Sequence, residues 1–379
     1  MNQSGERRIV LSAPGFPVSR EDPDKPFLLN HAKALMDAGF KVIVVCPALP
    51  HLSGRHMVEG IEVIRVRYAP RRFQTLALTG AMYNEARGLK SLLVLPMLFA
   101  MIAATIRELG RGNSIAYGHW WIPGGLVSVI AAFLSRRSSV VHLHGSDADL
   151  VNNRFKRWLA RSVLRGASVR LAVSADLARW GRRVSGRTVE VLPMPLNFEL
   201  LPKPSAVPAN GYLLAVGRLV PEKGFSVLIA AVALMNSDER PDLVIVGSGP
   251  DREKLSIEAT RLNVKLRLAG AVSPRELADW YRRARVVVVP SLREGFGLVS
   301  AEAAAAGRAV IATNVGAAAE IISDGHSGLL VKPGDASALS DALRTVDPEW
   351  GQNGPRRISH LNSANHASFV SEIWFQLNH

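Results

Sequence analysis

Short β-branched and aliphatic runs alternate with longer segments of helical periodicity along the 379-residue chain, and this alternation restricts the fold more than any other feature. Several of the short runs are continuously apolar, which is typical of parallel strands covered on both faces. The pattern therefore predicts an α/β fold built on parallel sheets. The predicted strands are Arg8–Ala13, Lys41–Cys46, Val63–Val66, Ser114–Gly118, Ser139–Leu143 and Val169–Val173 in the first half, and Tyr212–Val216, Leu243–Val246, Lys265–Leu268, Val286–Val289, Ala309–Ala312 and Leu329–Val331 in the second.

A proline-rich stretch without periodicity, residues 191–210, divides this pattern into two halves. Such composition is typical of an interdomain linker, and a chain of this length exceeds the usual size of one compact core. We therefore expect two domains with ligands at the carboxyl ends of their strands. The predicted parts are a Rossmann-like domain at residues 1–195, a linker at 196–210, a second Rossmann-like domain at 211–350 and a C-terminal segment at 351–379.

The C-terminal segment ends in an apolar pattern at helical spacing, made by Phe369, Val370, Ile373 and Trp374. A helix there has one apolar face that must be buried. Two interpretations carry equal weight: the helix crosses back onto the N-terminal domain, or it packs on the domain that precedes it.

The net charge of +14 is concentrated in one half of the chain. Residues 1–200 hold 27 Lys and Arg against 14 Asp and Glu, whereas residues 201–379 hold 19 against 18. A basic domain attracts anionic partners, such as an acidic membrane surface, a lipid pyrophosphate or an acidic glycan. The alternative is an arginine-rich surface that is merely solvated. Nucleic acid is not predicted, because no recognised binding motif is present.

The remaining bulk properties favour a cytoplasmic enzyme. Apolar residues make up 48% and charged residues 21% of the chain, which is ordinary globular usage. Cys46 is the only cysteine, so no internal disulfide is possible and a reducing compartment is expected. The polar N-terminus leads directly into a predicted strand and carries no signal-peptide pattern. We expect a cytoplasmic protein that can associate with the inner face of the cell membrane.

The run Gly217-Arg218-Leu219-Val220-Pro221-Glu222-Lys223-Gly224 follows a predicted strand and precedes a predicted helix. Its glycines allow a sharp turn and close approach to a ligand. Arg218 and Lys223 would lie near the start of the helix, where the amides already favour an anion. Neither a Walker loop nor G-x-G-x-x-G occurs, which argues against a nucleoside triphosphate and against NAD. The run indicates a diphosphate site; a solvated surface turn is the alternative.

A second element follows the strand that ends at Val289. Glu294 lies in the loop, Phe296 and Gly297 lead into a helix that starts near Leu298, and Glu302 lies about one turn inside. Free amides at that N-terminus can hold a phosphate or a sugar oxygen. Glu302 can accept two hydrogen bonds from a ribose diol, and its alanine neighbours predict a buried helix in which a carboxylate needs partners. In a third run, residues 270–274, the backbone of Val272 can bind the nucleobase.

These runs resemble the C-terminal half of glycosyltransferase family four. The resemblance is carried by "GRLVPEKG", "GAVSPRELADWYRRARVVVVPSLREGFGLVSAEAAAAG" and "AVIATNVGAAAEII", in this order. It implies a GT-B fold, with two Rossmann-like domains facing across a cleft, and a retaining hexosyltransferase that uses a UDP-sugar or GDP-sugar without a metal or other cofactor.

Carried over, the resemblance implies a role for each matching position. Arg218 and Lys223 would bind the donor diphosphate and act in catalysis, Glu294 would bind and act on the transferred sugar, and Glu302 would bind the ribose. Phe296, Gly297 and Leu298 would add main-chain contacts. In the first βα loop, Gly15 would lie at the diphosphate, although the double glycine common there is missing. The family's frequent Glu-Ala-Met-Ala-Cys-Gly appears here as Glu302-Ala303-Ala304-Ala305-Ala306-Gly307. These small replacements are expected to alter packing more than chemistry.

The first half is expected to hold the acceptor. His142 and His144 end a predicted strand, and His119 ends another, the positions at which α/β proteins present functional side chains. Strand alternation directs His142 and His144 to the same side, so either can be the site histidine. The family resemblance favours His144 as a catalytic and acceptor-binding residue, and His119 as a residue of the acceptor groove.

Two further features have competing interpretations. Asp147 and Asp149 form an Asp-x-Asp pair, and we expect one of the two to cap the helix predicted at residues 151–159 rather than to bind a metal. Residues 92–104 are the most apolar run but contain Pro96 and fall short of an ordinary membrane span. A buried crossover helix is the favoured interpretation, and monotopic insertion beside basic residues is the alternative.

The sequence therefore predicts a retaining glycosyltransferase that moves a sugar from a nucleotide diphosphate to a hydroxyl acceptor in surface polysaccharide or glycolipid synthesis. Its expected partners are the sugar nucleotide, a glycan or lipid-linked acceptor and an anionic membrane surface. One alternative is a non-catalytic polyanion or membrane-surface adaptor on a GT-B scaffold. The other is a GT-B sugar-nucleotide epimerase. The donor base, the sugar and the acceptor are left open.

Overall fold

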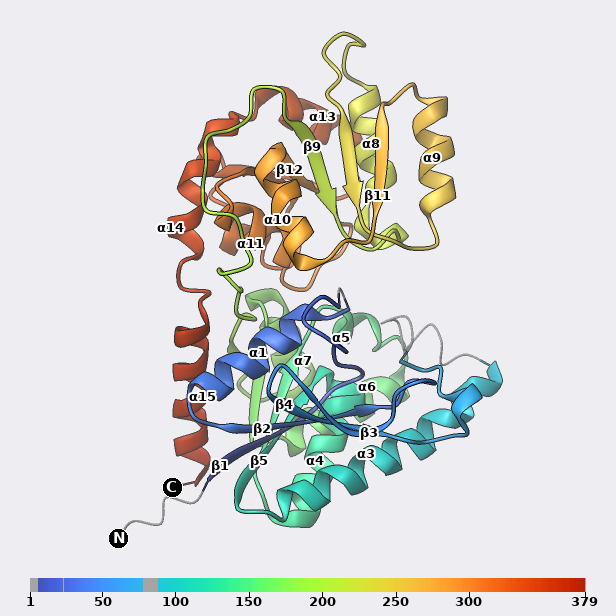
Figure 1. Ribbon diagram of the computed structural model, residues 1–379, viewed down its shortest axis with the longest axis vertical. Helices are drawn as coiled ribbons and strands as arrows, with labels where there is room; N and C mark the ends of the chain where they lie inside the picture. The colour runs from blue at the N-terminus through green and yellow to red at the C-terminus, as the bar shows by residue number, and fades with distance from the viewer. Residues whose placement is uncertain (1–5, 23, 78–87, 379) are drawn as a thin grey trace. The chain divides into compact units, whose positions relative to one another are not determined.

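The computed structural model describes residues 6–22, 24–77 and 88–378 (Figure 1). The chain divides into two compact units. The first comprises Met1–Pro195 together with Ser363–His379, and the second comprises Leu196–Asn362. Each unit is an α/β domain with its own sheet and its own hydrophobic cores.

The first unit is built on an eight-stranded sheet in the order β3-β4-β2-β1-β5-β6-β7-β8. All neighbouring strands are parallel except β3 and β4. The strands are β1 (Arg7–Ser12), β2 (Lys41–Pro47), β3 (Gly54–Val58), β4 (Ile61–Val66), β5 (Asn113–His119), β6 (Ser139–Leu143), β7 (Val169–Ala172) and β8 (Glu190–Val191). The α-helices are α1 (Pro26–Asp37), α3 (Val94–Leu109), α4 (Leu126–Ser135), α5 (Ser146–Asp149), α6 (Arg154–Gly166), α7 (Ala175–Ser185) and α15 (Ser363–Asn378).

Alternation along the strands sends side chains into two cores, one on each face of this sheet. On β1, Ile9 and Leu11 join a cluster that contains side chains of α1 and α15, whereas Val10 joins a cluster that contains side chains of α3 and α4. Every strand near the centre is thus covered on both faces, which explains why its sequence is continuously apolar.

The second unit is built on a six-stranded, all-parallel sheet in the order β11-β10-β9-β12-β13-β14. The chain moves outward on one side of β9 and then crosses to β12 on the other side. The point where the order reverses is where doubly wound sheets bind ligands. The strands are β9 (Tyr212–Val216), β10 (Leu243–Val246), β11 (Leu266–Gly270), β12 (Ala284–Val289), β13 (Ala309–Thr313) and β14 (Gly328–Val331). The α-helices are α8 (Phe225–Ala233), α9 (Arg252–Arg261), α10 (Pro274–Arg283), α11 (Leu298–Ala305), α12 (Ala318–Ile321), α13 (Ala336–Thr345) and α14 (Gly354–Ile358).

The twelve predicted strands all form, with small changes at their ends. The sequence did not predict β3, an exposed antiparallel edge strand, or β8, which has two residues. Edge strands lack a continuous apolar run because one side faces solvent. The short α5, α12 and α14 were also not predicted, since four or five residues carry too little periodicity.

The predicted linker is packed onto the second unit and has no helix or strand. The buried Arg308 side chain donates to the hydroxyl of Ser205 at 2.6 Å and to the carbonyl of Ala206 at 3.2 Å. Arg285 donates to the carbonyl of Ala209 at 3.0 Å. Residues 196–210 are therefore anchored at several points by long-range contacts that composition cannot reveal.

The C-terminal segment is shared between the units. Residues up to Asn362 belong to the second unit, and α15 belongs to the first. Val370, Ile373 and Trp374 are buried in the α1-side core of the first sheet. His366 also joins this unit, because its ring accepts or donates a 2.6 Å hydrogen bond with His31 of α1. Of the two interpretations of this helix, the structure has the one that returns to the first unit.

The apolar run at residues 92–104 lies in a longer helical segment than expected. In the described part of the chain, Lys90–Leu109 is long and apolar enough to cross a membrane by length and composition alone, with a third of its most apolar window buried. Met97 and Met101 are fully buried in the core against the sheet, whereas Phe99 is 72% exposed. The segment is a crossover helix between β4 and β5 with one face buried. It is longer than the predicted apolar run of residues 92–104, which by itself falls short of a membrane span.

Candidate active site

The loops after β9 and β12 pack backbone to backbone at the carboxyl edge of the second sheet. Gly224 has a φ of 67°, and a Cβ there would stand 2.0 Å from the carbonyl oxygen of Pro290. The amide of Leu292 donates to the carbonyl of Glu222 at 2.8 Å. Only glycine fits at position 224, since any side chain would clash with backbone and force a strained conformation. Gly224, in the predicted diphosphate run, therefore allows the loop after β9 to pack directly on the loop after β12, which carries Glu294.

Lys223 and Glu294 form an ion pair where these loops meet. Lys223 Nζ lies 2.6 Å from Glu294 Oε2, and the two side chains are 24% and 19% exposed. The hydroxyl of Ser291 donates to the same carboxylate oxygen at 3.2 Å, and the amide of Gly295 donates to Oε1 at 3.2 Å. A hydrogen bond between charged groups that are largely shielded from water holds both side chains in a defined geometry. Two predicted site residues are thus brought together and held in place.

The turn after Glu294 leads into a helix whose first amides have no side-chain cap. Gly297 is the N-cap of α11 with a φ of 88°. The amides that open a helix at Leu298 lack intrahelical partners and lie at the positive end of the helix dipole. Phe296 is buried and anchors the turn. Together these features form an anion site of the kind expected at helix N-termini.

Glu302 is half-buried on α11 and accepts a hydrogen bond from the hydroxyl of Tyr281 at 2.8 Å. Burial raises the pKa of Glu302 to about 7, and the hydrogen bond from Tyr281 opposes this rise. The expectation that Glu302 is not simply a solvated helix carboxylate is confirmed. Tyr281 was not predicted, because its position on α10 meets α11 only in the folded sheet.

Two other predicted donor residues lie at the same edge of the sheet. Arg218 lies two residues beyond the end of β9 and is exposed, and within the part of the chain that the structure describes its side chain makes no hydrogen bond or ion pair. Val272 is half-buried in the loop between β11 and α10. That loop is tied to the end of β10, because the amide of Gly247 donates to the carbonyl of Gly270 at 2.8 Å.

Gly15 belongs to the first unit, in the buried loop between β1 and α1. The loop is held by Arg65, whose guanidinium donates to the carbonyl of Phe16 at 2.6 Å. The contact of Gly15 with a donor diphosphate stays a prediction.

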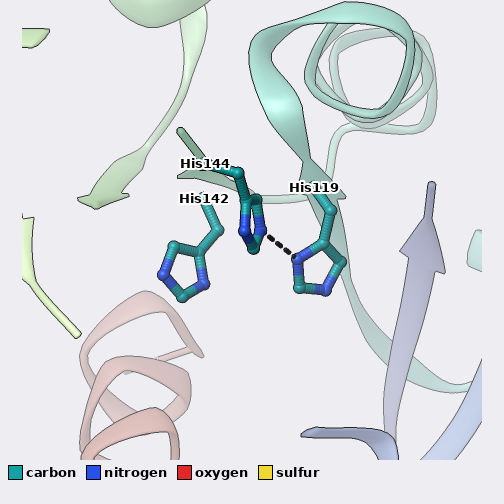
Figure 2. A group of neighbouring side chains, drawn as sticks. All are labelled: His119, His142 and His144. Atoms are coloured by element: carbon teal, nitrogen blue, oxygen red, sulfur yellow. Dashed lines mark hydrogen bonds between the residues drawn. The ribbon is translucent and has the colours of Figure 1, made fainter. Parts of the chain in front are cut away.

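In the first unit, His119 and His144 meet at the carboxyl ends of the neighbouring strands β5 and β6 (Figure 2). Nδ1 of His119 lies 3.0 Å from Nε2 of His144. The indole of Trp120 stacks on the His144 ring with centroids 4.3 Å apart. The position of the His144 ring is therefore fixed by its hydrogen bond to His119 and by stacking on Trp120. Trp120 was not predicted, although a Trp-Trp pair directly after a strand end was a visible signal.

The hydrogen bonds separate His142 from His144. Nδ1 of His142 lies 2.8 Å from the hydroxyl of Tyr117, and its Nε2 lies 2.8 Å from the carbonyl of Leu192. Both of its nitrogens are thus used inside the core, whereas His144 sits beyond the strand at the start of the loop. These contacts favour His144 over His142 as the site histidine, and the contact of His144 with a ligand stays a prediction.

Asp147 joins the two loops that carry these histidines. Its carboxylate accepts from the amide of Trp121 at 3.0 Å and from the amide of His144 at 2.6 Å. Burial raises the pKa of Asp147, and these amide bonds oppose the rise. The predicted capping role is wrong, because the N-cap of α6 is Asn153, whose side chain accepts from the amide of Lys156.

The ligand atoms of His119, His142 and His144 lie within 4.8 Å of one another, so by residue type and spacing these rings can hold a metal ion. Against this, both nitrogens of His142 already have partners, and a metal would have to displace Tyr117 or Leu192. Burial lowers the pKa of all three rings, to about 3 for His142, so the imidazoles are neutral near pH 7. The arrangement can position a ligand through hydrogen bonds without supplying positive charge.

Comparison with known proteins adds independent findings. The family "Glycosyl transferase 4-like domain" matches residues 26–197, and "Glycosyl transferases group 1" matches residues 199–348. Glycogen synthase of Mycobacterium tuberculosis is 30% identical over 372 residues, 85% of this chain and 82% of that protein. A glycosyltransferase named for teichuronic acid biosynthesis in Bacillus subtilis is 26% identical over 361 residues, 90% of each chain.

A glycosyltransferase of Methanocaldococcus jannaschii is 30% identical over a shorter region, 62% of this chain and 65% of its own length. Among solved structures, HepE of Anabaena in complex with UDP-glucose has a TM-score of 0.75 at 18% identity, and the match covers 98% of this chain and 100% of HepE. This likeness concerns the fold.

Proposed function

This chain belongs to the glycosyltransferase family defined by the group 1 domain, and from that premise we propose that it is a retaining hexosyltransferase that uses a nucleotide-diphosphate sugar. The resemblance noted from sequence and the prediction of a GT-B-type fold with two Rossmann-like domains are confirmed. Membership favours sugar transfer over the adaptor and over the epimerase.

The observation that carries the proposal is the Lys223–Glu294 pair beside the uncapped N-terminus of α11. Lys223 and the exposed Arg218 would bind the diphosphate, together with the first amides of α11. Glu294, already oriented by Ser291 and Gly295, would bind hydroxyls of the transferred sugar. UDP-glucose in the similar HepE structure supports a sugar nucleotide as the donor.

In the proposed reaction the acceptor hydroxyl attacks C1 of the donor sugar from the face that the diphosphate leaves. The C1–O bond to the β-phosphate breaks as the new glycosidic bond forms, and the departing phosphate oxygen takes the acceptor proton. Lys223 and Arg218 stabilise the charge that grows on the phosphate. His144 would position the reacting sugar and His119 the acceptor. We propose no metal, since the diphosphate charge is met by these side chains and amides.

For the acceptor we propose a growing surface glycan or a lipid-linked sugar, and for the protein a cytoplasmic location at the inner membrane face. The relative named for teichuronic acid biosynthesis supports a polysaccharide acceptor. The basic first half, with 27 Lys and Arg against 14 Asp and Glu, supports an anionic surface nearby.

Replacing Lys223 by Ala tests the proposal. Loss of one preorganised contact to a developing negative charge is worth about 3–4 kcal/mol, so turnover should fall about 10²- to 10³-fold. The donor is first chosen from a panel of UDP- and GDP-sugars by thermal stabilisation, because a ligand that binds only the native state raises the melting temperature. Transfer is then measured in EDTA, which tests the metal-free mechanism in the same assay.

The matched control is Lys254→Ala, which removes an exposed lysine from α9 of the same unit and should leave turnover unchanged. Both variants are checked for an unchanged melting temperature. A folded Lys223→Ala protein with wild-type turnover contradicts the proposal. Failure of every UDP and GDP compound to bind would favour the adaptor, and an epimerised sugar nucleotide formed without acceptor would favour the epimerase.

A further inference from the structure

Helix α6 (Arg154–Gly166) exposes aromatic side chains that its packing does not require. The helix buries Ala160, Val163 and Leu164 against the first unit. Phe155 and Trp158 lie on its solvent side, 67% and 60% exposed, with their rings stacked at a centroid distance of 6.0 Å. Large aromatic groups left in water are costly, so a pair on a helix surface indicates a partner.

Basic side chains surround this aromatic pair. Arg154, Arg157, Arg161 and Arg165 are exposed on the same helix at spacings of three or four residues, so they form a column beside Phe155 and Trp158. Helix α6 carries no acidic residue. A helix with an apolar inner face and a basic, aromatic outer face is the pattern of a surface helix at an anionic interface.

The neighbouring helices extend the pattern. Helix α4 contacts both α3 and α6, and it exposes Phe133 and Leu134 just before Arg136 and Arg137. Helix α3 exposes Leu95 and Phe99. The acidic residue on these three helices is Glu108, whose side chain is fully buried in ion pairs with Arg8, Arg55 and Arg111. The outer sides of α3, α4 and α6 therefore combine exposed apolar groups with positive charge and no exposed carboxylate.

We propose that the outer sides of α3, α4 and α6 dock on an anionic lipid bilayer, with Phe155 and Trp158 inserted among the headgroups and the arginines of α6 bound to lipid phosphates. Two properties of the surface favour lipid. Aromatic side chains prefer the interface between water and hydrocarbon, and arginines on a helix can spread over a surface of negative headgroups. The inference rests on the proposed location at the inner membrane face and names the surface that meets the lipid. Docking requires neither donor nor acceptor, so a failure of docking leaves the proposed sugar transfer intact.

The test is binding of the full chain to vesicles of phosphatidylcholine alone and of phosphatidylcholine with phosphatidylglycerol. The wild type should bind only the anionic vesicles. Each basic residue near an anionic surface contributes about fivefold in affinity, so Arg157→Gln with Arg161→Gln should weaken binding about 25-fold. The attraction should weaken from about 0.1 M to about 1 M salt, as the Debye length falls from about 10 Å to about 3 Å.

Depth of insertion gives a second readout. Lipids brominated on the acyl chain quench tryptophan fluorescence at close range, so vesicles of such lipids should quench the wild type and quench Trp158→Phe less. Phe155→Ser with Trp158→Ser should lower the bound fraction at high salt more than at low salt, because the apolar contribution is not screened.

Control substitutions come from α9 of the second unit, where Ile257 is 62% exposed and Lys254 and Arg261 are exposed. Ile257→Ser and the pair Lys254→Gln with Arg261→Gln should leave vesicle binding unchanged. Equal binding to neutral and anionic vesicles, no binding to either, or equal losses in the α6 and α9 variants would each overturn the proposal. So would a dimer in solution that Phe155→Ser with Trp158→Ser dissociates, because the face would then bind a second copy.

Discussion

At the scale of single residues, the ionisation of Glu302 should control donor binding near neutral pH. Burial raises the pKa of Glu302 to about 7, and only the carboxylate can accept both hydrogen bonds of a ribose diol. The affinity for a sugar nucleotide should therefore fall as pH decreases through 7, by up to about tenfold per pH unit. Titration calorimetry between pH 8 and pH 5.5 with an intact sugar nucleotide, whose diphosphate does not titrate in this range, measures it.

Two substitutions isolate this effect. Glu302→Gln should bind the donor more weakly and without the pH dependence, since the amide does not titrate. Tyr281→Phe removes the hydrogen bond that lowers the pKa of Glu302, so the loss of affinity should begin at higher pH. A wild-type affinity that is constant across this range would contradict the assignment of Glu302 to the ribose.

At the scale of elements, α15 stabilises the first unit although it follows the second in the chain. Trp374 is 4% exposed in the core against β1 and β2, and its ring lies 6.0 Å from that of Phe40. Trp374→Ala should therefore lower the free energy of unfolding of the first unit by about 3–5 kcal/mol. Denaturant unfolding measures this, with the exposed Gln376→Ala on the same helix as the control. Equal effects of the two changes would mean that α15 does not complete this core.

At the scale of the whole molecule, the first unit should be sensitive to acid. Burial lowers the pKa of the five buried histidines in this unit, to about 3 for His142 and about 4 for His366, and it also lowers the pKa of the half-buried His56. In the unfolded chain these histidines titrate near 6.5, so below that pH the unfolded state binds more protons and stability falls. The raised pKa of Asp147 acts in the opposite direction but is a single group. The stability that the neutral histidines contribute is present above pH 6.5 and is lost as pH falls toward 4.

The expected loss is large compared with ordinary stability. The five buried histidines against one carboxyl group correspond to about 5 kcal/mol per pH unit near pH 5.5, whereas domains are usually stable by about 5–15 kcal/mol. Chemical denaturation of the first unit at pH 7.5, 6.5 and 5.5 measures the slope. His142→Gln, which keeps polarity but does not titrate, should reduce the slope by about one proton. Equal stability at all three pH values would contradict the neutral state of these rings.

The sequence alone determined the elements and the local parts of the site. β-Branched runs and helical periodicity located the central strands, because burial on both faces leaves a continuous apolar signature that is read locally. Gly224, Lys223 and Glu294 were predicted for a similar reason. Each lies in a strand–turn–helix unit, whose geometry is set within about ten residues.

The tertiary structure decided which of these parts meet. The contacts of His119 with His144, of Glu302 with Tyr281 and of Arg308 with the predicted linker depend on strand order and helix packing. So does the return of α15 to the first unit. A periodic pattern states which face of an element is apolar but not which neighbour covers it. The long-range contacts, and with them the different hydrogen-bond partners of His142, His144 and Asp147, therefore appear only in the folded chain.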